Sequence, residues 1–376
     1  MTRVVLAGGG YAHLFVLESA LRGALAGCEL VVVSPEEPLS CTEMLPGVVA
    51  GRISAESAVI DIRRLTDRVR GRFVHDRVAR VDAAGRVLTL ESGERLGYDL
   101  LSLSVTADLA GHDLPGVAEH AMPARPLSGA LAISAALDRA MTQPGPEPFR
   151  VVVVGAGPSG VELALAARAR LDRQGNVAAA VTILEAGHTV LPIAPPQAQS
   201  EARRTLKRAD VTLRAATAVA EVGPGHLKLV GDGVLPADLL IWATGTVAPP
   251  LFRASGLPTE SHGFLLIDES LRVIGHPRIL GSGDGVVLDA WRHAPRSGAA
   301  AVRQGPVLAA NLALLAADPD AARGFRHFRP RRRALNLMAT GDGRAILSYD
   351  PVVMRGAWVL GLKDRMDRRF VARFGS

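Results

Sequence analysis

Two glycine-rich turns are the parts of the sequence best suited to chemistry, and the second is the more complete. The stretch "VVVVGAGPSGVELA" places Gly155, Gly157, Ser159 and Gly160 between an apolar run and a helical pattern. Such a turn brings backbone N–H groups and the positive end of a helix against a pyrophosphate. Glu185 ends the next apolar run, where a carboxylate accepts hydrogen bonds from ribose hydroxyls. Because that carboxylate repels a 2′-phosphate, the pattern predicts binding of NADH rather than NADPH.

The N-terminal turn, "RVVLAGGGYAHL", is a less regular version of the same motif. His13 stands where a third glycine would allow close packing of helix on strand, so we expect a wider approach. Ser34, rather than an acidic residue, ends the next apolar run. The residues predicted to contact a nucleotide here are Gly8, Gly10, Tyr11, Ala12, His13 and Ser34.

Two further strand ends agree with a pair of nucleotide-binding domains. "DLLIWATG" is an apolar run that ends at Gly245, and "HPRILGSGDG" is one that ends at Gly283 and Asp284. A carboxylate at such a strand end can bind the ribityl hydroxyls of a flavin. Two fingerprints in one chain therefore predict two dinucleotide domains, which position the chemistry between them.

Composition narrows the class of protein. With 376 residues and 48% hydrophobic residues the chain can form two globular domains, and its two cysteines fit a reducing compartment rather than a disulfide scaffold. The N-terminus has no signal-peptide pattern, and we expect no run of about 18 apolar residues that could span a membrane. The net charge of +6 comes mainly from arginines that are not interleaved with aromatic residues in the body of the chain, so we expect no nucleic-acid partner. No metal site is expected.

Taken in their order along the chain, the motifs resemble those of the two-dinucleotide-binding-domain flavoproteins of the pyridine nucleotide-disulfide oxidoreductase superfamily. The likeness is greatest to type II NADH dehydrogenase-like proteins and to the flavoprotein module fused to selenophosphate synthetases. It rests on "GGGYAH", "MLPGVVAG", "GPSGVELA", "EAGHTVLP", "GSGD", "AVRQGPVLAANL" and "GAWVLGLKDRMDRRF". The resemblance implies an α/β fold with two Rossmann-like domains, the second inserted in the first. FAD would bind residues 1–108 and 263–327, NADH would bind 109–262, and 328–376 would form a C-terminal appendage.

The same resemblance implies roles for single residues. Pro46 and the backbone of Val78 would contact FAD, and Glu162 would lie near the nicotinamide. Gln304 lies in the helix that meets a quinone in the resembled dehydrogenases. Hydride would pass from nicotinamide C4 to flavin N5 and electrons then to a quinone-like acceptor. The alternatives are a helix N-terminal glutamate at 162, favoured by the macrodipole, and a helix-surface amide at 304.

Cys41, in "PLSCTEMLPG", has three interpretations. It could be a redox thiolate beside the flavin, as in single-cysteine NADH oxidases and peroxidases, a small apolar residue near the flavin, or a loop residue packed elsewhere. A reactive thiolate needs a lowered pKa, whereas Glu36, Glu37 and Glu43 would raise it. A disulfide with Cys28 is disfavoured because an apolar strand separates the two residues.

The C-terminal tail predicts a basic amphipathic helix. An apolar stripe repeats every four residues among arginines and one lysine, at Trp358, Leu362, Met366, Phe370 and Phe374. Such a helix can lie on an anionic membrane surface, which would place the protein in the cytoplasm and peripherally on the inner face of the cytoplasmic membrane. Alternatively the stripe packs on the chain's own core or on a second subunit, giving a homodimer.

The leading functional hypothesis is an FAD-dependent NADH oxidoreductase with a quinone-like acceptor and no redox disulfide. One alternative is a Cys41-dependent NADH oxidase or peroxidase. The other is a non-catalytic relative that senses nucleotides, because the first fingerprint departs from the usual pattern at His13, Ser34 and Thr106.

Overall fold

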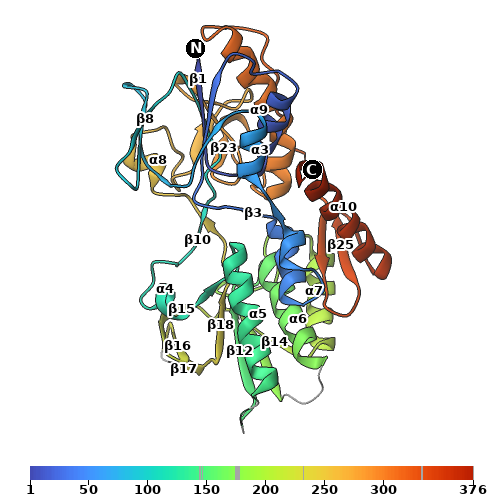
Figure 1. The fold of residues 1–376 in the computed structure, drawn as a ribbon. Coiled ribbons are helices and arrows are strands. Elements are labelled where there is room, and N and C mark those ends of the chain that lie inside the picture. Colours follow the sequence, from blue (N-terminus) through green and yellow to red (C-terminus); the bar gives the residue numbers. More distant parts are fainter. Residues whose placement is uncertain (144, 146, 174–177, 232, 332, 376) are drawn as a thin grey trace.

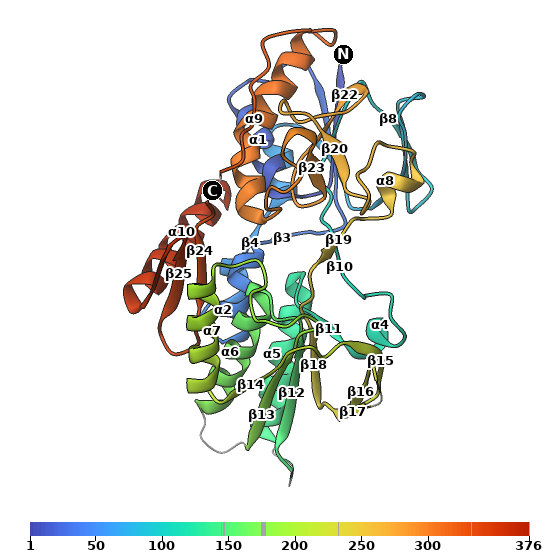
Figure 2. The same cartoon turned by 180° about the vertical axis from the view of Figure 1, so that it is seen from behind.

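The computed structural model of the chain describes residues 1–143, 145, 147–173, 178–231, 233–331 and 333–375. Figure 1 shows two units stacked end to end, with the C-terminal segment lying along one side of both. Figure 2 shows the same arrangement from behind. This is the predicted mixed α/β architecture, with one nucleotide fingerprint in each unit.

The first unit is built on an eight-stranded sheet. Its strands run in the order β23 (Val286–Leu288), β20 (Leu265–Ile267), β21 (Arg272–Val273), β22 (His276–Gly281), β9 (Leu100–Leu103), β1 (Arg3–Ala7), β2 (Glu29–Val33) and β5 (Arg72–Val74). From β22 to β5 every neighbouring pair is parallel. Strands of this kind are covered on both faces, which explains their continuous apolar runs.

The same parts of the chain also form helices and two small sheets, and one of the short helices packs on the second unit instead of on this large sheet. The helices are α1 (Tyr11–Leu21), α2 (Leu45–Val49), α3 (Ile62–Arg68), α8 (Leu251–Ala254) and α9 (Gly298–Ala317), with short 3₁₀ turns η1 (Thr42–Met44), η2 (Ala55–Ala58) and η3 (Asp289–Trp291). The small strands are β3 (Leu39–Ser40) paired with β4 (Val59–Ile60), and the antiparallel set β6 (Val78–Asp82), β7 (Val87–Leu90) and β8 (Arg95–Gly97).

The second unit carries a five-stranded parallel sheet. Its order is β11 (Met122–Pro123), β18 (Leu239–Trp242), β12 (Phe149–Val154), β13 (Ala179–Leu184) and β14 (Val211–Arg214). The helices are α4 (Val117–His120), α5 (Leu127–Thr142), α6 (Pro158–Asp172) and α7 (Pro196–Arg208). An antiparallel meander of β15 (Val219–Gly223), β16 (His226–Leu229) and β17 (Gly233–Pro236) completes the unit.

A two-stranded ribbon marks where the chain passes between the units. β10 (Asp108–Leu109) pairs antiparallel with β19 (Thr246–Val247), so the outward and return crossings lie side by side. After the return, Phe252 of α8 is buried in the core of the first unit. The upper limit predicted for the inserted domain, residue 262, lies beyond this return. In the other direction, Leu45 and Val49 of α2 belong to the core of the inserted unit.

The C-terminal appendage is a small sheet covered by the last helix. Strands β24 (Asn336–Ala339), β25 (Ala345–Tyr349) and β26 (Val352–Gly356) are antiparallel, and α10 (Ala357–Gly375) follows directly. The sheet lies between α10 on one side and α6 and α7 of the inserted unit on the other. The appendage therefore contacts both nucleotide-binding units.

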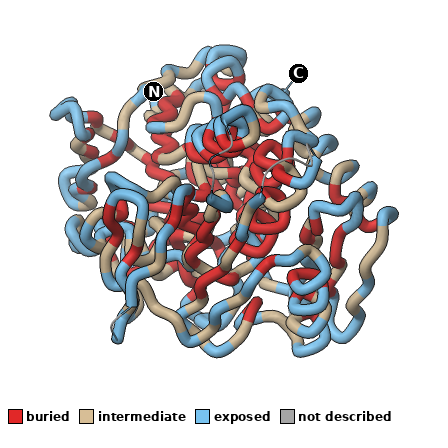
Figure 3. Tube along the Cα trace, turned by 90° about the horizontal axis from the view of Figure 1, so that it is seen from below, coloured by how far each residue is buried: buried red, intermediate tan, exposed pale blue. Residues whose placement is uncertain are grey.

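The buried residues lie between the sheets and the helices that cover them. Figure 3 shows buried segments in the interior and exposed segments around the rim. By length and composition alone α9 could cross a membrane, which departs from the expectation that no segment is long and apolar enough. Half of its most apolar window is buried inside the protein, where the helix packs on α1 and carries the buried polar residues Gln304 and Asn311.

Candidate functional site

The second fingerprint forms an open cradle at the N-terminus of α6. Gly155 has φ +105°, and a Cβ added at Gly160 would collide with the carbonyl of Gly155, so glycine is required for close packing of helix on strand. A Cβ added at Gly157 would meet nothing within 4 Å. No side chain caps α6, so the backbone N–H groups of its first turn are available to an anion. This cradle fits the pyrophosphate of a dinucleotide.

Glu185 stands at the end of β13 beside that cradle. Its Oε2 accepts a hydrogen bond from Ala156 N at 2.8 Å, and its Oε1 accepts one from Gly187 N at 2.8 Å. Two backbone donors thus fix a half-buried carboxylate whose remaining lone pairs can accept from ribose hydroxyls. Ser159 is exposed at the start of α6, and the carbonyl of Gly245 accepts from Ala110 N. These positions fit the predicted NADH half.

The first fingerprint is more crowded. Gly8 has φ +96°, and a Cβ there or at Gly10 would collide with Ser104. The Cβ direction of Gly9 is filled by the hydroxyl of Ser34. Helix α1 begins after Gly10 with no side-chain cap. The anion-binding end of the helix is therefore present, with less free space around the turn than at the second fingerprint.

His13 takes a structural position in place of the missing glycine. Its ring is fully buried, Nδ1 donates to Gly8 O at 2.6 Å, and Nε2 accepts from Ser102 Oγ at 2.9 Å. The tautomer follows from the carbonyl, which can only accept. Burial lowers the pKa of His13 to about 4, so the imidazole is neutral at physiological pH. The histidine ties α1 to β1 and β9 instead of contacting solvent.

Two buried hydroxyls at the first fingerprint lack partners. Among the described residues, Ser104 Oγ and Ser282 Oγ make no hydrogen bond, and Ser104 lies between the Gly10 and Gly283 turns. Buried hydroxyls are normally paired, so these two fit a polar ligand such as the pyrophosphate and ribityl chain of a flavin. Ser34 instead pairs locally with Glu36, through both the N–H and the carbonyl.

Asp284 follows Gly283 at the expected strand end and is already engaged. Its Oδ1 accepts from Ala107 N at 3.1 Å, and its Oδ2 pairs with Arg125 at 3.3 Å. Of the other predicted contacts on this side, Ala12 and Val78 are buried in the core of the first unit, and Pro46 is buried in α2. Arg125 comes from the inserted unit and was missed by the sequence analysis, because no local pattern marks it.

Gln304 is a buried residue, so its interpretation as a surface amide was wrong. Its Oε1 accepts from Gly283 N at 2.8 Å, across the gap between α9 and the Gly283 turn. The side chain thus fixes the loop that carries Asp284. Whether it also meets an acceptor stays a prediction.

Cys41 is buried and belongs to the core of the first unit. Burial raises the pKa of its thiol to about 12, and Glu43 and Asp367 add to the shift. The direction agrees with the sequence argument, although burial contributes most and Glu36 and Glu37 do not contribute. A thiol with this pKa is almost wholly protonated at neutral pH and is a poor nucleophile. Cys28 is likewise a free cysteine.

Glu162 faces the appendage, in a buried cluster of charged groups. Its Oε1 accepts from Ala339 N at 2.7 Å, and burial raises its pKa to about 7 against the opposing effect of Lys363. Lys363 reaches in from α10 and donates to Glu43 O at 2.7 Å and to Asp367 at 2.9 Å. Burial alone would lower the pKa of Lys363, but Glu162 and Asp367 raise it.

The cluster joins three parts of the molecule. Tyr11, from α1, donates to Glu43 Oε2 at 2.6 Å and accepts from Thr42 N at 2.8 Å. Lys363 is only 5% exposed. Its burial was not expected, because the basic residues around it in the sequence predict an exposed face of the helix. The helical spacing could have shown this, because Lys363 lies on the same face of the helix as Val359 and Phe374, which are both buried. The first unit, the inserted unit and the appendage therefore meet at one charged site.

The apolar stripe of the tail is divided between two environments. Phe370 and Phe374 pack edge-on against Tyr11 and Phe15, at centroid distances of 5.1 and 5.2 Å. Trp358 and Met366 are 54% and 47% exposed. The C-terminal half of α10 is thus docked on the chain's own core, as the alternative interpretation held. Nearer its start the helix packs on the appendage sheet and buries Val359, while Trp358 and Met366 lie on an exposed face.

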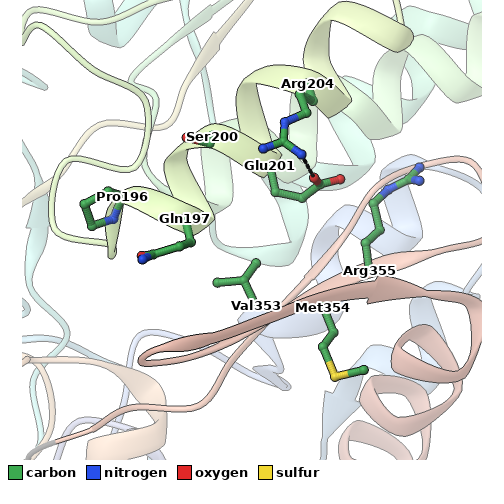
Figure 4. Close-up of a pocket in the computed structure, with 8 residues that line it drawn as sticks. All are labelled: Pro196, Gln197, Ser200, Glu201, Arg204, Val353, Met354 and Arg355. Carbon is green, nitrogen blue, oxygen red and sulfur yellow. Dashed lines mark ion pairs between the residues drawn. The ribbon is translucent and has the colours of Figure 1, made fainter.

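A groove of about 400 Å³ lies between α7 and β26, in which Val353 points toward the helix and Met354 points away (Figure 4). Its lining residues are Pro196, Gln197, Ser200, Glu201, Arg204, Val353, Met354 and Arg355. None of the predicted site residues lines this groove, so it is separate from both cradles.

Comparison with known proteins agrees with this geometry. Demethylphylloquinone reductase NdbB of Synechocystis sp. is 29% identical over 51% of this chain and 47% of its own length. Alternative NAD(P)H-ubiquinone oxidoreductase C1 of Arabidopsis thaliana is 28% identical over 75% of this chain and 61% of its own length. The chain therefore covers about half to three-fifths of the length of these two relatives.

The fold also matches solved structures. NDH2 from Plasmodium falciparum, solved in complex with NADH, superposes with a TM-score of 0.82 at 16% identity, covering 98% of this chain and 97% of that one. At that identity the match establishes the shared fold. A family model described as pyridine nucleotide-disulphide oxidoreductase matches residues 2–305. Since this match takes in both fingerprints and both units, the chain belongs to the pyridine nucleotide-disulphide oxidoreductase family.

Proposed function

We propose that the protein is an FAD-dependent NADH oxidoreductase that reduces a quinone-like acceptor without a redox disulfide. The observation that carries the proposal is the pair of uncapped helix N-termini, α1 and α6, each facing its own glycine turn. One relative is named a demethylphylloquinone reductase and another an NAD(P)H-ubiquinone oxidoreductase, which supports the acceptor class. A bound flavin would accept hydride from NADH and pass the electrons on.

The protein's own residues have supporting roles in this scheme. Gly155, Gly157 and Gly160 would hold the NADH pyrophosphate, and Glu185 its adenosine ribose. Asp284, fixed by Ala107 and Arg125, would hold the flavin ribityl chain. Because burial keeps Cys41 as a thiol, the electrons would leave the flavin directly, which disfavours the Cys41-dependent oxidase or peroxidase.

The test is the visible spectrum of the purified protein, before and after anaerobic addition of NADH. A flavin band that bleaches with NADH and recovers on addition of a soluble quinone is the expected result. Cys41→Ser should behave in the same way. A flavin that bleaches but recovers only when Cys41 is present would replace the proposal with the oxidase or peroxidase reading.

A second candidate function is nucleotide sensing without turnover. The crowding of Gly9 and Gly10 by Ser34 and Ser104 favours it, because these side chains take up space at the first cradle. A protein that binds NADH but cannot be reconstituted with FAD would support sensing and overturn the oxidoreductase proposal.

Membrane-surface contact is part of the same proposal. We infer that the exposed face of α10, with Trp358 and Met366 among Arg365 and Arg369, rests on an anionic bilayer at the inner face of the cytoplasmic membrane. Vesicles containing anionic lipid should cosediment with the protein and lose it when Trp358 and Met366 are both replaced by serine. Equal binding by both proteins would contradict this contact.

A further inference from the structure

Arg125 joins the inserted unit to the strand end that carries Asp284. Its Nη1 donates to Asp284 Oδ2 at 3.3 Å, and its Nη2 donates to Ala107 O at 2.7 Å. The N–H of Ala107 in turn donates to Asp284 Oδ1 at 3.1 Å. The side chains of Arg125 and Asp284 are 21% and 22% exposed. Both oxygens of Asp284 are therefore held in a largely buried, closed set of hydrogen bonds.

A second tie lies two residues further along the chain. Helix α5 begins at Leu127 with no side-chain cap of its own. The backbone N–H of Leu127 donates instead to the buried hydroxyl of Ser40, in β3 of the first unit, at 3.0 Å. Residues 125–127 thus attach the inserted unit to the first unit at two separate points. The first tie ends at Ala107, directly before β10, whereas the second ends at Ser40, far from the β10–β19 ribbon in sequence. Together they restrict rotation about the ribbon.

We call residues 125–127 and their partners in the first unit the joint. It touches the proposed sites of both cofactors. Asp284 is the carboxylate placed for the flavin, and α5 belongs to the unit placed for NADH. Hydride transfer is sensitive to small errors of alignment, since a displacement of about 1 Å can lower a rate roughly a hundredfold. A guanidinium with a fixed fork of donors can hold two acceptors in one geometry, which a lysine cannot.

We propose that Arg125 is a positioning residue that orients Asp284 and also sets the inserted unit over the flavin, so that flavin retention and hydride transfer depend on one side chain. The proposal rests on the proposed function, because it assigns Arg125 a task in that reaction. It goes further in stating that the two cofactor sites are coupled through the joint at residues 125–127.

The test compares Arg125→Met with a matched control, Arg150→Met. Arg150 also pairs with an aspartate, Asp238, but within the inserted unit and outside both cradles. Arg125→Met should weaken FAD binding about tenfold, the effect of losing a charged hydrogen bond. It should also slow single-turnover flavin reduction at saturating NADH about tenfold or more, with NADH affinity unchanged. Arg125→Lys should recover part of the FAD affinity, and Arg150→Met should match the unaltered protein.

Each contrary result is decisive. If Arg125→Met retains FAD and transfers hydride as Arg150→Met does, the proposal is overturned. If FAD is held less tightly but the reloaded variant transfers hydride at the normal rate, the coupling is overturned. Should Arg125→Met fail to fold, Arg125→Gln, which keeps an amide donor for Ala107 O, carries the same comparison.

Failure of the proposed function can be told apart. If the unaltered protein neither binds FAD nor oxidises NADH, calorimetry of the protein without cofactor tests the joint by itself. Arg125→Met should then broaden or split the unfolding transition, because the two units are less firmly coupled, and Arg150→Met should leave it single. Identical transitions in the two variants would overturn the role of the joint.

Discussion

At the scale of single residues, the second fingerprint offers two glycines with opposite structural demands. Gly160→Ala should destabilise the protein by about 1–3 kcal/mol, because its Cβ would collide with the carbonyl of Gly155. Gly157→Ala should leave stability unchanged but weaken NADH binding about tenfold or more, because its Cβ would project into the open cradle. Urea unfolding and NADH titration measure the two effects. Equal loss of stability in both variants would show that the cradle is not open.

The cysteines give a second prediction at this scale. Because burial raises the pKa of Cys41 to about 12, the native protein should resist alkylation at this residue at pH 8. Unfolding in denaturant should make it reactive, and Cys28, which is partly exposed, serves as the internal comparison. Peptide mass mapping after a timed exposure to iodoacetamide gives the rates. Rapid labelling of native Cys41 would restore the redox interpretation.

At the scale of elements, α10 should be held by its buried side chains and not by the exposed part of its apolar stripe. Phe374 is buried against Phe15, so Phe374→Ala should cost about 3 kcal/mol of unfolding free energy. Trp358→Ala, at an exposed position of the same helix, should cost far less. Thermal unfolding of both variants makes the comparison. A larger effect at Trp358 would mean that the exposed face of the helix is packed in solution, for example on a second subunit.

The elements also show how far sequence patterns reach. Both glycine turns, their flanking strands and the strand ends at Glu185 and Asp284 were predictable, because each is a local pattern of a few residues. Partners from distant segments were not, and so Arg125 and Lys363 were missed. The role of Gln304 as a buried partner of the Gly283 turn was also missed, because helix periodicity alone did not show which face of α9 meets the first sheet.

At the scale of the whole molecule, two buried groups should act in opposite directions on the pH dependence of stability. Burial lowers the pKa of His13 from 6.5 to about 4. The unfolded state therefore binds the proton first, and the free energy of unfolding falls as the pH falls through that interval. Burial raises the pKa of Glu162 from 4.5 to about 7. The folded state therefore holds the proton longer, and the free energy of unfolding falls as the pH rises through that interval. Each effect is on the order of 3 kcal/mol, and the two nearly cancel between pH 4.5 and 6.5.

Single variants should reveal the hidden terms. Relative to the unaltered protein, Glu162→Gln should gain stability as the pH rises from 4.5 to 7, and His13→Asn should lose stability as it rises from 4 to 6.5. Urea unfolding at a series of pH values provides the slopes, and the double variant should again follow the unaltered protein. Parallel curves for all four proteins would show that neither group titrates as inferred.

The paired crossing strands β10 and β19 have a consequence for how the protein can be modified. Since Asp108–Leu109 and Thr246–Val247 are hydrogen-bonded neighbours, the chain enters and leaves the inserted unit at one place. One continuous stretch of the gene encodes everything between them. A homologous stretch with a different nucleotide preference could be substituted there with two adjacent splices, provided that it keeps the surfaces for α2 and for the appendage sheet, and an arginine at residue 125. The inserted unit could in this way be exchanged as one piece while the first unit and the appendage are kept.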